Sequence, residues 1–116
     1  MIAPGGRRIV LATAPVDFRR GMDSLAALVQ LALAANPFCG DIFIFRSKRA
    51  DRIKILVWDG TGLWLHQKRL ETGRFVWPPI RDGLIALSPL QLNMLLEGLE
   101  WSRAAPAKTK SPALAC

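Results

Sequence analysis

The chain contains two segments in which apolar residues recur at the spacing of a helix. The first begins after Asp23 or Ser24, either of which can accept a backbone N–H as the N-cap, and runs to about Ala35. The second opens at Ser88-Pro89, because serine caps helices and proline suits the first helical position. The pattern therefore predicts one helix near each end of the chain.

Short apolar runs rich in β-branched and aromatic residues lie between these helices, and such runs are typical of strands. The clearest of them are residues 41–45, 53–58 and 63–70. Short connections between them favour antiparallel hairpins, because a parallel crossover needs about a dozen residues or more. Weaker runs of the same kind stand at 8–13, 75–77 and 84–87. We expect an antiparallel β-meander of three to four strands.

These elements predict an α+β fold in one small domain with an N-terminal and a C-terminal helix. With 116 residues, of which 51% are hydrophobic, the chain can fill one core. We place the domain at residues 1–101 and interpret residues 102–116 as a flexible basic tail. No apolar run is long enough for a bilayer, and the two distant cysteines form no disulfide framework, so we expect a cytoplasmic protein without a membrane partner.

The charge of the chain is strongly basic, with 16 Lys and Arg against 9 Asp and Glu and a net charge of +7. Such an excess favours anionic partners, among which nucleic acid is the commonest. The alternative is that the charged side chains only form a solvated rim around a hairpin and bind no partner. Antiparallel pairing would bring the cations near residues 46–54 and 68–74 to one end of the sheet. The residues that we predict to contact DNA phosphates are Arg46, Lys48, Arg49, Arg52, Lys54, Lys68, Arg69 and Arg74.

Trp64 is a candidate for contact with a base or a protein partner. Alternation along its strand places Trp64, His66 and Lys68 on one face. A tryptophan that shares a face with a lysine can be partly exposed and can stack on a base. Packing in the core is the alternative for Trp64, and it is what we expect of Trp58 and Trp77.

Asp59 poses the question of catalysis, because it stands in Asp59-Gly60-Thr61-Gly62 between two apolar runs. Asp-Gly in this setting is a strong hairpin signal, so we interpret Asp59 as a turn residue. A metal-dependent nuclease is the alternative, and it needs two or three carboxylates around Mg²⁺. The candidates for such a site are scattered along the chain: Asp17, Asp23, Asp41, Asp51, Asp59, Glu71 and Asp82. We therefore expect no catalytic residue, no metal and no cofactor.

Several segments together carry a family resemblance. They are PVDFRRGMD at 15–23, NPFCGDIFIFR at 36–46, KILVWDGTGLWL at 54–65, KRLETGRFVWP at 68–78 and LNMLLEGL at 92–99. With these segments in order from about residue 9 to 101, the chain resembles the TnpB accessory proteins, the second reading frame of insertion sequences of the sixty-six family.

The resemblance implies an accessory protein of DNA transposition in a bacterial mobile element. It implies a separately encoded transposase that carries the acidic catalytic residues, and it assigns no catalytic residue to this chain. The partners it implies are that transposase and DNA, either at the element end or at the target. Two roles stay open at this point: DNA binding through the basic hairpin region, or docking on the transposase as an adaptor that does not itself bind DNA.

Overall fold

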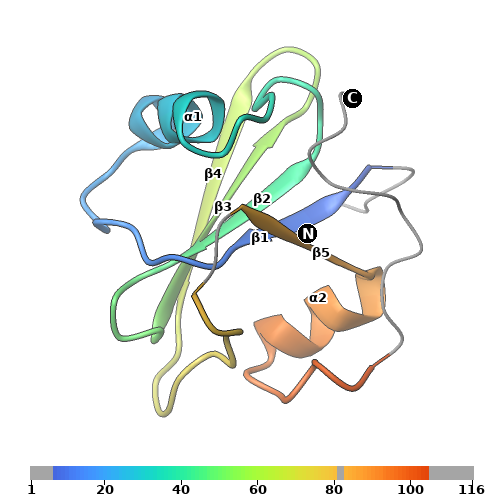
Figure 1. The fold of residues 1–116 in the computed structure, drawn as a ribbon. Coiled ribbons are helices and arrows are strands. Elements are labelled where there is room, and N and C mark those ends of the chain that lie inside the picture. Colours follow the sequence, from blue (N-terminus) through green and yellow to red (C-terminus); the bar gives the residue numbers. More distant parts are fainter. Residues whose placement is uncertain (1–6, 81–82, 105–116) are drawn as a thin grey trace.

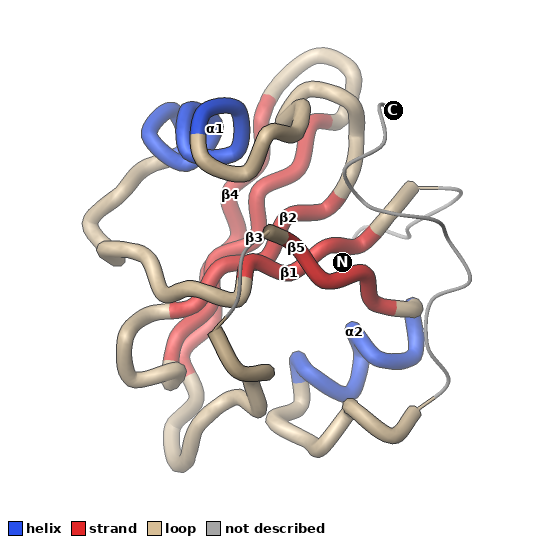
Figure 2. Tube along the Cα trace, in the orientation of Figure 1, coloured by secondary structure: helices blue, strands red, loops and turns tan. Residues whose placement is uncertain are grey.

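One five-stranded sheet with a helix on each face forms the protein (Figure 1). The computed structural model describes residues 7–80 and 83–104. The strands are β1 (Ile9–Ala12), β2 (Ile42–Arg46), β3 (Arg52–Trp58), β4 (Leu63–Arg69) and β5 (Leu84–Leu87), and the helices are α1 (Met22–Leu31) and α2 (Pro89–Leu96). Figure 2 shows the two helices on opposite sides of the strands. The predicted α+β class is confirmed.

The strand order is β4-β3-β2-β1-β5, so the sheet is larger than the predicted meander and mixed in direction. The antiparallel pairs β2–β3 and β3–β4 form the meander that the short connections predicted. β1 adds to it parallel to β2, and β5 pairs antiparallel with β1. The parallel pair is possible because the long connection between β1 and β2 includes α1 and crosses one face of the sheet.

The predicted strand at 75–77 was wrong, because these residues belong to no strand. Phe75 is buried, and the Trp77 indole N–H donates to the carbonyl of Ala12 at 3.0 Å. The Trp101 indole N–H donates to the carbonyl of Val76 at 2.8 Å. Large side chains and indole hydrogen bonds therefore dock this segment against the core from outside the sheet.

The two helices differ in how they begin. Ser88 caps α2 as predicted, since its hydroxyl accepts from the Gln91 N–H at 3.1 Å and its own N–H donates to the Gln91 side chain at 2.9 Å. The predicted caps of α1 were wrong, because Gly21 is the N-cap and no side chain bonds there. The hydroxyl of Ser24 instead accepts from Arg20 at 2.8 Å.

Alternation along the strands divides the core into two clusters. Ile9 and Leu11 of β1 pack on the face that α2 covers, whereas Val10 packs with Leu25 and Val29 on the face that α1 covers. The sheet therefore needs both helices to bury its two apolar faces.

Two further findings bear on the predicted domain and location. Neither helix in the described ranges is long and apolar enough to cross a bilayer. The predicted tail lies outside the described residues from position 105 onward, and the boundary at residue 101 stays a prediction.

Candidate nucleic-acid interface

Five of the predicted cations lie at one end of the sheet, where β2 turns into β3 and the chain leaves β4. Two backbone hydrogen bonds join the loops there: the Leu70 N–H donates to the carbonyl of Asp51 at 2.9 Å, and the Phe75 N–H donates to the carbonyl of Ala50 at 2.7 Å. The loop after β4 is thereby held against the β2–β3 loop. The exposed cations gathered here, which we call the basic end, are Lys48, Arg49, Arg52, Arg69 and Arg74.

Arg52 and Arg69 stand directly opposite each other in the β3–β4 ladder. Residues in that relation point to the same face, and two like charges there repel each other. Glu71 lines a shallow hollow together with both arginines. Even so, within the part of the chain that the structure describes, neither guanidinium makes an ion pair or hydrogen bond. The fold thus keeps two adjacent arginine charges without neutralising them.

Lys54 must be withdrawn from the predicted phosphate contacts, because its side chain is turned into the protein. The residue is only 6% exposed, and its ammonium donates to the carbonyls of Phe18 at 2.7 Å and Arg20 at 2.8 Å. The same ammonium lies 4.6 Å from the centre of the Phe18 ring. Lys54 therefore anchors the connection between β1 and α1 on β3 and has no free charge to offer DNA.

Arg46 and Lys68 lie in the same row of the sheet as Ile53, which belongs to the face covered by α2. The Lys68 ammonium donates to the carbonyl of Leu96 at 2.6 Å, where the C-terminal end of α2 favours a positive charge. Arg46 is half-buried and donates to the carbonyl of Lys48 at 3.1 Å, and burial lowers the pKa of its guanidinium. Both cations support the fold, since Lys68 binds the end of α2 and Arg46 binds the backbone of the β2–β3 loop.

Asp59 forms the turn that its Asp-Gly context predicted. One carboxylate oxygen accepts from the N–H groups of Thr61 and Gly62, each at 2.9 Å, and the other accepts from the indole of Trp64 at 2.6 Å. The hydrogen bonds from Thr61, Trp64 and Gly62 lower the pKa of Asp59 well below its usual range. Gly60 has a φ of +106°, which favours glycine at this corner. Both oxygens are therefore engaged within the turn.

Trp64 is 51% exposed, yet its ring is held in place. Its N–H is bound by Asp59, and its ring lies parallel to the His66 ring, with 5.6 Å between centroids and 3° between planes. Trp64 and His66 thus share a face as the alternation predicted. The arrangement gives the edge strand β4 a fixed and partly exposed aromatic surface.

The carboxylates proposed for a metal nuclease are dispersed in the fold. Asp17 pairs with Arg19 and Asp41 with Arg8, each at 2.7 Å. Asp23 lies in the first turn of α1, and Asp82 lies outside the described residues. Over residues 7–80 and 83–104, no three His, Cys, Asp or Glu side chains are grouped to hold a metal ion.

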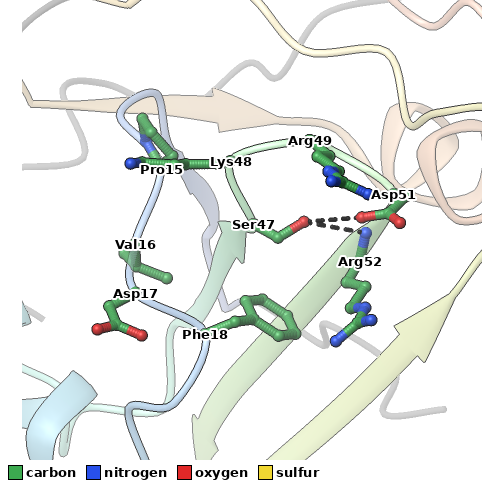
Figure 3. A pocket seen from close by; sticks show the side chains of 9 residues that line it. All are labelled: Pro15, Val16, Asp17, Phe18, Ser47, Lys48, Arg49, Asp51 and Arg52. Atoms are coloured by element: carbon green, nitrogen blue, oxygen red, sulfur yellow. Dashed lines mark hydrogen bonds between the residues drawn. The ribbon is translucent and has the colours of Figure 1, made fainter.

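A hollow of about 510 Å³ lies beside the basic end, between the β1–α1 connection and the β2–β3 loop (Figure 3). No pattern along the chain indicates this hollow, because its two walls are about thirty positions apart in the sequence. The Val16 N–H, which donates to the carbonyl of Arg46 at 3.0 Å, and the two bonds of Lys54 bring the walls together. Its lining residues are Pro15, Val16, Asp17, Phe18, Ser47, Lys48, Arg49, Asp51 and Arg52.

Comparison with known proteins confirms the family resemblance. A family model described as IS66 Orf2 like protein matches residues 7–106. The uncharacterized protein y4jC of Sinorhizobium fredii is 51% identical over 113 residues, which cover 97% of this chain and 97% of that protein. The uncharacterized protein y4hO of the same organism is 43% identical over 111 residues, with 94% and 95% covered. No solved structure matches this chain significantly.

Proposed function

This chain belongs to the family of IS66 Orf2-like proteins, which indicates an accessory role in transposition, and we propose that it performs this role by binding DNA phosphates. The basic end makes the contacts, either at the element end or on target DNA. The protein itself is not catalytic, and the chemistry belongs to a separately encoded transposase.

The observation that supports this proposal most strongly is the opposed pair Arg52 and Arg69. Like charges directly opposite each other destabilise a strand pair, by an amount within the ~0.2–1 kcal/mol range of cross-strand pairs. Folding alone gives no reason to place them there. A phosphate seated between two guanidinium groups removes the repulsion and accepts hydrogen bonds from both, because the arginine fork matches its oxygens.

The remaining cations of the basic end extend the same surface. Lys48, Arg49 and Arg74 are exposed in the loops that the backbone bonds hold together. Contacts of this kind fix a protein on DNA without reading its bases. Each neutralised phosphate releases counterions. The logarithm of the association constant for duplex DNA therefore falls with the logarithm of the salt concentration, with a slope of about −0.9 per phosphate contact.

A double variant tests the proposal. Arg52→Ala with Arg69→Ala should weaken duplex binding and reduce the salt slope by about 1.8, the value for two lost phosphate contacts. The variant should remain folded, since it removes a repulsion rather than a hydrogen bond. Arg7→Ala is a control for the loss of charge outside the basic end, because it removes a positive charge beside Gly40, at the opposite end of β2. Equal slopes for wild type and the double variant would contradict the proposed contact.

A second candidate function is an adaptor that docks on the transposase without binding DNA. The observation in its favour is Trp64, since partly exposed and rigidly held aromatic rings are typical anchors of protein interfaces. This function predicts that the protein co-purifies with the transposase of the same element from nuclease-treated extract, and that Trp64→Ser abolishes the complex. Absence of any complex with the wild-type protein would exclude the adaptor.

A further inference from the structure

The hollow beside the basic end has two walls of different chemistry. The β2–β3 loop and the start of β3 contribute Lys48, Arg49 and Arg52 (Figure 3). The β1–α1 connection contributes Pro15, Val16 and the ring of Phe18 on the other side. A cationic wall facing an apolar and aromatic wall matches a ligand that is anionic at one end and flat and apolar at the other.

The three cations of this wall are available to a ligand. In the described part of the chain none of them makes an ion pair or a side-chain hydrogen bond. Of the two carboxylates of the hollow, Asp17 pairs with Arg19 at 2.7 Å, and Asp51 keeps its charge while it accepts from the Ser47 hydroxyl at 3.1 Å. The three cations of the lining therefore outnumber its carboxylates, and the net charge of the hollow is positive.

Phe18 is placed as a stacking surface. Its side chain points from the β1–α1 connection into the hollow, toward Ser47 and Arg52 (Figure 3). The Lys54 ammonium sits 4.6 Å from the ring centre and also binds the Phe18 carbonyl at 2.7 Å, so the ring is held from the protein side. A ring fixed in this way stacks on a base without first losing conformational freedom.

The size of the hollow selects among nucleic-acid ligands. Its volume of about 510 Å³ lies in the range of pockets that enclose one small molecule. A duplex presents phosphates on a convex surface and keeps its bases stacked inside, so it can touch the rim but cannot fill the hollow. A base enters only when it is unpaired or has left the stack.

We infer that the hollow binds one unpaired DNA nucleotide, with its base against Phe18 and its phosphate between Arg49 and Arg52. This inference rests on the proposed function, which it deepens by naming the form of DNA that is preferred. The basic end holds the adjoining duplex, and the hollow takes a nucleotide that extends beyond the paired region.

Three labelled ligands test the inference by fluorescence anisotropy with the full chain. They are a blunt duplex, the same duplex with a short single-stranded overhang, and that overhang with abasic residues in place of its nucleotides. We expect the overhang ligand to bind about tenfold more tightly than the abasic one, a ratio within the range of a single base–aromatic stack. The abasic ligand supplies the added phosphates without the bases, so it isolates the contribution of stacking.

Two variants locate the base. Phe18→Leu should remove the preference for the overhang and leave blunt-duplex affinity unchanged, whereas Trp64→Leu should keep the preference. Equal binding of the overhang and abasic ligands by the wild type would overturn the inference while the proposed function stands. A preference that is lost in Trp64→Leu and kept in Phe18→Leu would overturn it as well. Failure to bind any of the three ligands would overturn the proposed function itself.

Discussion

Replacement of Lys54 by methionine should destabilise the protein far more than replacement of any exposed cation. The Lys54 ammonium donates two hydrogen bonds, at 2.7 Å to the carbonyl of Phe18 and at 2.8 Å to that of Arg20. Methionine keeps a similar stem in the same space but has no donor. The change therefore removes the bonds that hold the β1–α1 connection on β3 and leaves the packing largely intact.

The magnitude follows from the two bonds. A hydrogen bond from a charged donor contributes about 1.5–3 kcal/mol to stability. Phe18 and Arg20 are both partly exposed, so their carbonyls can bind water in the variant, and the lower value applies to each. Two bonds then give a loss of about 3 kcal/mol. At roughly 4 °C per kcal/mol for a domain of this size, Tm should fall by about 12 °C.

Thermal unfolding followed by circular dichroism measures this shift. Arg74→Met is the matched control, because Arg74 is exposed and makes no ion pair or side-chain hydrogen bond among the described residues. It should change stability by no more than about 0.5 kcal/mol. A Tm shift in Lys54→Met as small as that of the control would refute the assigned role, and Lys54 would again be a candidate for phosphate contact.

Two further predictions concern the turn and the last helix. Ser88→Ala removes the serine hydroxyl of the α2 capping box and should lower the free energy of unfolding by about 1 kcal/mol. Denaturant unfolding measures this loss, and an unchanged free energy would mean that the cap adds nothing to stability. Hydrogen bonds hold the pKa of Asp59 low, so its stabilising effect is present above the unfolded value of about 3.9 and is lost as the pH falls through the folded value. The Tm advantage of wild type over Asp59→Asn should therefore shrink from about pH 6 to about pH 2, and a constant difference would contradict this role.

Local signals in the sequence predicted the centre of the fold correctly. The meander β2–β3–β4 follows from apolar runs joined by short connections, and the turn at Asp59 follows from aspartate and glycine chemistry that acts within four residues. Ser88 as a cap is equally local. Elements of this kind depend on residues that are neighbours in the chain, so the pattern of the sequence predicts them.

Features that depend on distant residues were not predictable in the same way. Nothing in the run at 8–13 shows that β1 pairs in parallel with β2. Lys54 carries no sign that its ammonium turns inward, because the acceptors are backbone carbonyls of Phe18 and Arg20, which any residue types would supply. The run at 75–77 has the composition of a strand. Hydrogen bonds of the Trp77 and Trp101 indoles nevertheless hold it outside the sheet.

The candidate site was predicted in part for the same reason. Antiparallel pairing predicted that cations near residues 52 and 69 meet at one end of the sheet, and the register of the structure places Arg52 opposite Arg69 there. It cannot reveal that Lys68 reaches the end of α2 on the other face, or that Phe18 lines a hollow with Arg49. Those contacts depend on where the β1–α1 connection and α2 lie, and the pattern of the strands does not predict these positions.

Binding of DNA phosphates by the basic end can be measured in a single titration. Wild-type protein is titrated into labelled duplex DNA, with an element-end sequence and a scrambled sequence, at several salt concentrations. If the basic end contacts phosphates, the affinity for both duplexes falls steeply with salt, and the log–log slope reflects several phosphate contacts at about −0.9 each. Absence of binding near physiological salt, or an affinity that does not depend on salt, would contradict these contacts.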